Sequence, residues 1–139
     1  MTTASQKTLF RKLARRSAQI AADKKAREIT ILDLVDKSGV AEFVVLATVD
    51  SRPQMEAVAS DIELKLKEDG YLKLHSEGRG SAQWQVLDFG GLLVHVLVEQ
   101  ARQFYGLDKL YHFAKKVPFI DATPSPAKPR KAPAARKRK

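Results

Sequence analysis

The stretch WQVLDFGGLLVHVLV, residues 84–98, carries the strongest structural signal in this chain of 139 residues. Two apolar segments flank the pair Gly90-Gly91, and a two-residue Gly-Gly link between such segments is typical of a β-hairpin. In a two-residue loop Val86 lies opposite His95, and alternation along each strand then separates two faces. One face is nearly all apolar and is expected to lie under helices: Gln85, Leu87, Phe89, Leu92, Val94, Val96 and Val98.

The other face of the predicted hairpin mixes polar groups with aliphatic residues: Trp84, Val86, Asp88, Leu93, His95 and Leu97. Asp88 and His95 are diagonal neighbours on it and lie within reach of each other. A hydrolytic triad also needs a nucleophile beside the histidine, and the sequence has no G-x-S-x-G motif. Two other roles stay open for this face, a hydrogen-bonded and partly buried histidine or a protein-recognition surface around Trp84.

Upstream of the hairpin the sequence predicts two strands, a helix and a third strand. Residues 29–35 and 43–49 are short and β-branched, and the second segment is apolar on both faces, as in a central strand. Ser51 and Gln54 then form a capping-box pattern, and Gly70 is a typical helix stop. Residues 71–75 alternate and predict a strand near an edge of the sheet.

Residues 1–28 predict a basic amphipathic helix. Apolar and small residues recur at three- and four-residue spacing: Phe10, Leu13, Ala14, Ser17, Ile20 and Ala21. The segment is rich in Arg, Ser and Thr and has no acid before Asp23, a composition that mitochondrial transit peptides share. Two interpretations stay open, the leading helix of a bacterial cytoplasmic protein and a targeting segment for the mitochondrial matrix.

Residues 117–139 predict a disordered tail, because from Pro124 onwards there are four prolines, no acid and no large apolar residue. Its role is either nucleic-acid binding or solubility. In the first case the basic side chains displace counterions from phosphates, and they are Lys128, Arg130, Lys131, Arg136, Lys137, Arg138 and Lys139.

The positive charge lies at the two ends of the chain. Of 25 Lys and Arg, five lie in residues 1–16 and seven in residues 124–139, which leaves 13 basic and 16 acidic residues between them. A slightly acidic body with basic ends fits a partner that presents both a polyanion and basic protein. There is no Cys and only three His, so we expect no metal centre or cofactor. No apolar run approaches the ~18–20 residues that cross a bilayer, so no membrane association is expected.

Residues 99–114 predict two short helices broken at Gly106. They contain Tyr, Phe and Arg, which are enriched at protein interfaces, although the aromatic residues could equally close the core.

Several motifs, taken in order, resemble the Iojap-like ribosomal silencing factors. The segments ILDL (31–34), FVVLAT (43–48) and SRPQ (51–54) are similar to the front half of that family. WQVLDFG (84–90) followed by VHV (94–96) resembles its W-x-x-x-D-x-G and V-H signature, and RQFYGLDKLY (102–111) resembles its closing R-x-F-Y-x-L-E-x-L-W motif. The resemblance covers residues 8–116. The chain departs from the family pattern at four positions: Val49 for Gly, Gly91 for an acid, Asp108 for Glu and Tyr111 for Trp.

The resemblance implies an α+β fold over residues 29–116. Its mixed β-sheet of about five strands would be packed with helices in a nucleotidyltransferase-like topology, without the catalytic carboxylates. The resemblance also implies binding to the large ribosomal subunit through its L-fourteen protein. That binding would block small-subunit joining and repress translation under nutrient limitation, with members often homodimeric.

Carried over residue by residue, the resemblance assigns partner binding to two groups of side chains. Trp84 and Tyr105 are the expected anchors, and Asp88 or Asp108 is expected to pair with basic groups of the partner. The full set is Trp84, Asp88, His95, Arg102, Tyr105, Leu107, Asp108, Leu110 and Tyr111.

Two other functional classes compete with this interpretation. A general RNA-binding accessory protein would act through the basic ends and contact rRNA. An enzyme is disfavoured, because the close acidic pair Glu68-Asp69 lies on different sides of a helix end and does not form a metal-holding carboxylate cluster.

Overall fold

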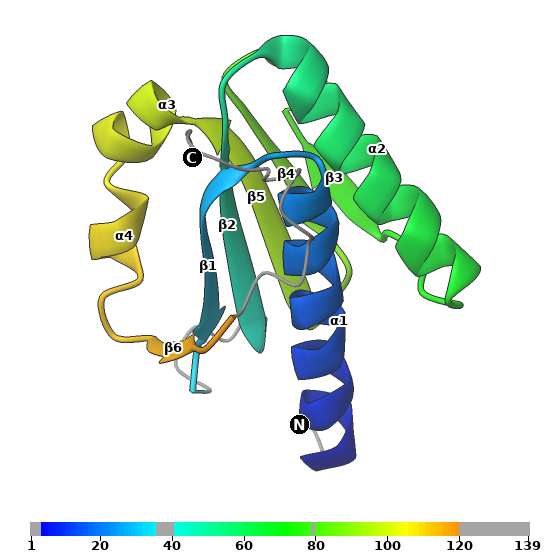
Figure 1. Cartoon of the computed structure of the whole chain (residues 1–139). Coiled ribbons are helices and arrows are strands. Elements are labelled where there is room, and N and C mark those ends of the chain that lie inside the picture. The colour runs from blue at the N-terminus through cyan, green and yellow to red at the C-terminus, as the bar shows by residue number, and fades with distance from the viewer. Residues whose placement is uncertain (1–3, 36–40, 79, 120–139) are drawn as a thin grey trace, which may run out of the picture.

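The structure is a computed structural model that describes residues 4–35, 41–78 and 80–119, with helices on both faces of one sheet (Figure 1). Residues 120–139, with all the basic residues assigned to the tail, lie outside the described residues. The elements in chain order are α1 (Ala4–Asp23), β1 (Arg27–Asp33), β2 (Phe43–Val49), α2 (Arg52–Glu68), β3 (His75–Glu77), β4 (Trp84–Asp88), β5 (Leu92–Val98), α3 (Glu99–Phe104), α4 (Leu107–Leu110) and β6 (Lys115–Val117).

The sheet is mixed, with the strand order β3-β4-β5-β2-β1-β6. The predicted hairpin is confirmed, because β4 and β5 pair antiparallel with Val86 opposite His95. β2 pairs parallel with β5 and antiparallel with β1, and all seven of its residues are buried. The prediction of a central strand at 43–49 is therefore confirmed, as is the α+β fold class.

Two hydrophobic clusters fill the two sides of the sheet. The larger cluster joins β2, β4 and β5 to α1 and α2, which lie side by side on one face. The smaller cluster joins the opposite face to α3 and α4, through Leu97, Ala101 and Leu107. The molecule therefore has a two-helix face and a face covered by short helices. No helix in the described part of the chain has the length and apolarity needed to span a membrane.

Local chemistry defines both ends of α2. The backbone N–H of Gln54 donates to Ser51 Oγ at 3.1 Å, and the side-chain oxygen Oε1 of Gln54 accepts from the backbone N–H of Asp50 at 2.7 Å. At the C-terminus Gly70 has φ +99°, and the Tyr71 N–H donates to the Leu66 carbonyl at 2.8 Å. These bonds satisfy helix-end groups that would otherwise have no partner.

The prediction of a third strand near an edge is confirmed, because β3 is an edge strand of the sheet. The predicted bounds 71–75 are wrong, because β3 is His75–Glu77. The helix-end motif at Gly70 turns Tyr71 back against the larger cluster, and pairing with β4 starts only at His75, opposite Asp88. A sixth strand, β6, was not predicted. It has three residues, two of them lysines, and it forms because Val117 pairs with Ile31 at the edge of β1.

Close packing against α1 explains the glycine at position 91. A Cβ atom there would lie 2.3 Å from the ring of Phe10. The hairpin and the first helix therefore meet at a place with no room for a side chain.

Candidate protein-binding surface on α3 and α4

A buried arginine holds the short helices on the sheet. Arg102 is 6% exposed, and its Nε and Nη2 donate to the two carboxylate oxygens of Asp108 at 2.9 and 3.0 Å. Nη1 donates to the Glu28 carbonyl at 2.7 Å and to Thr48 Oγ1 at 3.0 Å, and Nη2 also donates to Thr30 Oγ1 at 3.1 Å. All five N–H groups of the guanidinium therefore have acceptors.

The arginine joins parts of the chain that are far apart in sequence. Glu28 lies at an irregularity in the β1–β2 register between Arg27 and Thr30, so its carbonyl is available to Arg102. Hydrogen bonding by Arg102 lowers the pKa of the Asp108 carboxyl, which stays ionised at neutral pH. Arg102 and Asp108 thus fix α4 on β1 and β2, and their charges are paired within the chain.

A second set of hydrogen bonds is centred on His95 of β5. The Trp84 indole N–H donates to His95 Nδ1 at 3.0 Å, and His95 Nε2 lies 3.2 Å from the Tyr111 hydroxyl. Burial lowers the pKa of His95 to about 4, so the imidazole is neutral at physiological pH. His95 is therefore a buried, hydrogen-bonded histidine that orients Trp84 and Tyr111.

Aromatic side chains are exposed above this support. The Tyr105 ring lies 4.8 Å from that of Trp84 and 4.9 Å from that of Phe104, centroid to centroid. Phe104 is 82% exposed and Tyr105 54% exposed, which is unusual for side chains of this size. We call Trp84, Phe104 and Tyr105 the aromatic surface. Leu110 on α4 is a further exposed apolar side chain.

The structure separates the remaining predicted residues by environment. Leu107 is buried and anchors α4 in the smaller cluster. Asp88 accepts from the Gly90 N–H at 2.8 Å and lies at the other end of β4 from Trp84, roughly 13 Å away along the strand. In the described part of the chain Asp88 has no hydrogen bond to His95, so the diagonal pair that the hairpin allowed does not form.

Sequence reasoning missed Phe104 as a site residue. With Tyr105 it lines an open hollow of about 330 Å³, together with Gln83, Gln100 and Ala101. The available signal was the pair Phe104-Tyr105 at the end of a short helix, where adjacent side chains point about 100° apart and a short helix buries only one side. Among residues 4–35, 41–78 and 80–119, no group of three or more carboxylates or imidazoles could hold a metal ion.

Comparisons with known proteins agree with this architecture. The family model described as "Ribosomal silencing factor during starvation" matches residues 7–139. The chain is 30% identical over 102 residues to "Ribosomal silencing factor RsfS" of Chromobacterium violaceum, which covers 73% of this chain and 84% of that protein. It is 33% identical over 95 residues to the protein of the same name from Bacillus subtilis, covering 68% and 80%.

A plant relative and solved structures extend the comparison. "Protein Iojap, chloroplastic" of Arabidopsis thaliana is 33% identical over 106 residues, covering 75% of this chain and 44% of that protein. A crystal structure from C. violaceum superposes with a TM-score of 0.71 at 28% identity, covering 84% of this chain and 94% of the other. One from Bacillus halodurans gives 0.65 at 28% identity, covering 78% and 95%. The chain therefore belongs to the family of ribosomal silencing factors.

Proposed function

We propose that this protein binds the large ribosomal subunit through the aromatic surface, against the L-fourteen protein, and so prevents the small subunit from joining. Translation is then repressed when nutrients are limiting. The observation that carries the proposal is the pair of exposed rings, Phe104 and Tyr105, packed on the partly buried Trp84 through Tyr105, in a chain whose family is named for silencing ribosomes.

The chemistry of the surface supports a protein partner. Tyr, Trp and Phe are enriched at interfaces because they bury a large area while losing few rotamers. Here His95 fixes the Trp84 ring by a hydrogen bond, and the Tyr105 ring packs on Trp84, so little order has to be gained on binding. The central part of the chain has a net negative charge, which favours encounter with a basic ribosomal protein.

Light scattering of purified subunits tests the proposal. The full chain, added in excess to large subunits, is expected to abolish the rise in scattering that accompanies association with small subunits. Phe104→Ala combined with Tyr105→Ala should restore that rise, since both side chains are exposed and their loss leaves the core intact. Leu64→Ala is the matched control, because Leu64 is an exposed apolar residue on α2, on the other face.

Two results would reject the proposal. In one, the full chain leaves association unchanged at concentrations well above those of the subunits. In the other, the double variant, folded by circular dichroism, inhibits as well as the unchanged protein. A third result would favour the general RNA-binding alternative. In that case inhibition weakens steeply as salt is added, and neither the Phe104→Ala, Tyr105→Ala double variant nor Leu64→Ala changes it.

Oligomeric state and location belong to the same proposal. We expect a homodimer when no ribosome is present, which sedimentation equilibrium can measure. The protein has to work in a compartment that contains ribosomes, and its named relatives are bacterial and chloroplastic. We favour the bacterial cytoplasm, with the mitochondrial matrix as the alternative.

A further inference from the structure

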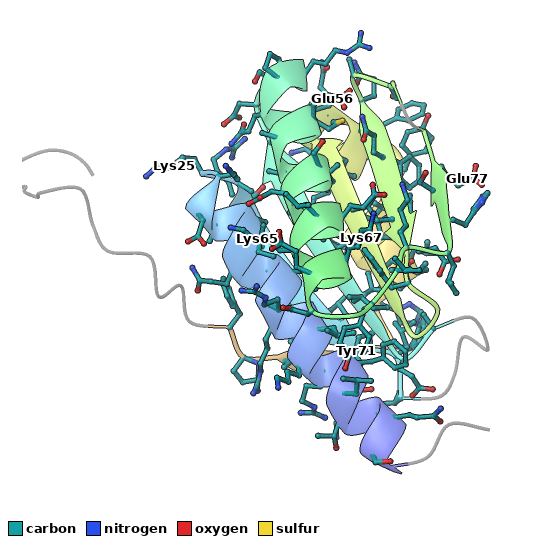
Figure 2. The ribbon with its side chains drawn as sticks, turned by 90° about the vertical axis from the view of Figure 1, so that its right-hand side faces the viewer. Lys25, Glu56, Lys65, Lys67, Tyr71 and Glu77 are labelled. Atoms are coloured by element: carbon teal, nitrogen blue, oxygen red, sulfur yellow. The ribbon has the colours of Figure 1, made fainter. Side chains whose placement is uncertain are left out.

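A groove on the two-helix face remains unassigned by the function proposed above. It has a volume of about 430 Å³, within the usual range of ligand sites, and it lies between α1 and the residues that follow α2. Figure 2 shows Tyr71 beside α1, just beyond the C-terminal end of α2. The lining residues are Leu9, Lys12, Leu13, Arg16, Asp69 and Tyr71.

The floor and wall of the groove are apolar and fixed in position. Leu13 is buried, and Leu9 and Tyr71 are partly buried against the larger cluster. The backbone of Tyr71 is held by its hydrogen bond to Leu66 at the end of α2. One aromatic ring therefore stands at the groove with part of its surface exposed.

The rim of the groove is cationic. Arg16 Nε donates to Asp69 Oδ2 at 3.0 Å. The positive charge of Arg16 is therefore offset by Asp69, the only carboxylate among the lining residues. Lys12 lines the groove, and Arg15 lies one turn further along α1, next to Lys12 but outside the lining. Both side chains are exposed, and neither has an ion-pair partner among the described residues. α1 itself has no acidic residue in its first turn, and its single acid is Asp23 at the far end.

We propose that this groove binds single-stranded RNA, with one unstacked base packed against Tyr71 and Leu13 and its flanking phosphates paired with Lys12 and Arg15. The inference rests on the proposed function, which brings the protein onto a surface made of RNA and protein. Aromatic rings beside a positive groove are the usual way in which proteins hold single-stranded nucleic acid.

The position of the groove suits this role. It lies on the face of the sheet that carries α1 and α2, whereas the aromatic surface lies on the face of α3 and α4 (Figure 1). One molecule can therefore engage a protein and an RNA strand at the same time. An acidic peptide would also meet the cations, but it would have no planar group to stack on Tyr71.

Fluorescence anisotropy of a labelled uridine decamer with the full chain tests the proposal. Lys12→Gln with Arg15→Gln is expected to weaken binding at least tenfold. It should also reduce the slope of log affinity against log salt by roughly 1.4, about 0.7 for each lost phosphate contact. Arg52→Gln with Lys109→Gln removes the same charge at exposed sites away from the groove, and should weaken binding less than threefold.

The ring of Tyr71 is tested separately. Tyr71→Leu keeps an apolar side chain but removes the stacking surface, so we expect about tenfold weaker binding with an unchanged salt slope. Tyr71→Phe keeps the ring and should bind as the unchanged protein does. Thermal unfolding of each variant verifies that the fold is retained.

Three outcomes would overturn the proposal: equal losses in the two double variants, equal binding by Tyr71→Leu and Tyr71→Phe, or displacement of the RNA by polyglutamate at equal charge concentration. Residues 124–139 are unchanged in every variant, so their contribution cancels in each comparison. The assay contains no ribosome, so its result is independent of whether the aromatic surface blocks subunit association.

Discussion

His95 is held in one tautomer by its neighbours. An indole N–H can only donate, so the His95 Nδ1 that receives it carries no proton. The ring proton is then on Nε2, which donates to the Tyr111 hydroxyl. Protonation of the ring would place a second N–H against the Trp84 N–H, in addition to the cost of burying a charge.

This arrangement makes stability depend on pH. The pKa of His95 falls from 6.5 to about 4 on folding, so between these values the unfolded chain binds more protons than the folded one. The contribution of neutral His95 to the free energy of unfolding is fully present above pH 6.5 and is lost as the pH falls towards 4. From pH 7 to pH 5 His95 alone should remove about 2 kcal/mol of the free energy of unfolding.

Urea denaturation at pH 7 and pH 5 measures this effect. His95→Asn, which does not titrate and keeps an acceptor, should show a smaller loss than the unchanged protein over the same interval. Equal losses in both proteins would mean that His95 is not the titrating group.

Gly91 is a second residue whose role depends on a single contact. Gly91→Ala should destabilise the protein by about 1–3 kcal/mol, because its Cβ would overlap the Phe10 ring and push α1 away from the hairpin. In the background of Phe10→Ala the same change should cost much less. Urea unfolding of the unchanged protein, the two single variants and the double variant gives the coupling energy between positions 10 and 91. If the effects of the two substitutions simply add, the packing explanation is contradicted.

At the scale of elements, the attachment of α3 and α4 depends on Arg102. Arg102→Lys should lower the free energy of unfolding by about 2–3 kcal/mol, because an ammonium group cannot reach the acceptors on β1, β2 and α4 together. Asp108→Asn should cost less, because Asp108 is exposed and water replaces its bonds. Chemical denaturation followed by Trp84 fluorescence measures both, and the reverse order would contradict this role.

The elements that the sequence predicted are those that local chemistry defines. The Gly90-Gly91 turn sets the register of the hairpin, and Ser51, Gln54 and Gly70 set the ends of α2. The bounds of β3 and the existence of β6 could not be predicted, because each strand has three residues and forms only where a neighbouring strand offers an edge. The motif that carries the candidate site could be read from the sequence. The hydrogen bond of Arg102 to the Glu28 carbonyl, 74 residues away, could not, because no local pattern shows it.

On the scale of the whole molecule, basic residues 124–139 and the folded body can be separated experimentally. Deleting residues 124–139 should leave the urea midpoint unchanged, because the segment has no large apolar residue. The same deletion removes seven positive charges and should reduce the salt slope of RNA binding by up to about 5. Inhibition of subunit association should persist, and its loss would assign that activity to the basic segment.

The place of β6 in the sheet has a consequence for the nascent chain. Among the described residues β1 is the first strand to be synthesised, and the strand that covers its outer edge, Lys115–Val117, is the last. Until that strand leaves the ribosome, the backbone of Ile31 and its neighbours is an open edge able to pair with other chains. A translation product that stops before residue 115 would therefore be prone to aggregation, even though nearly all of its core has been made.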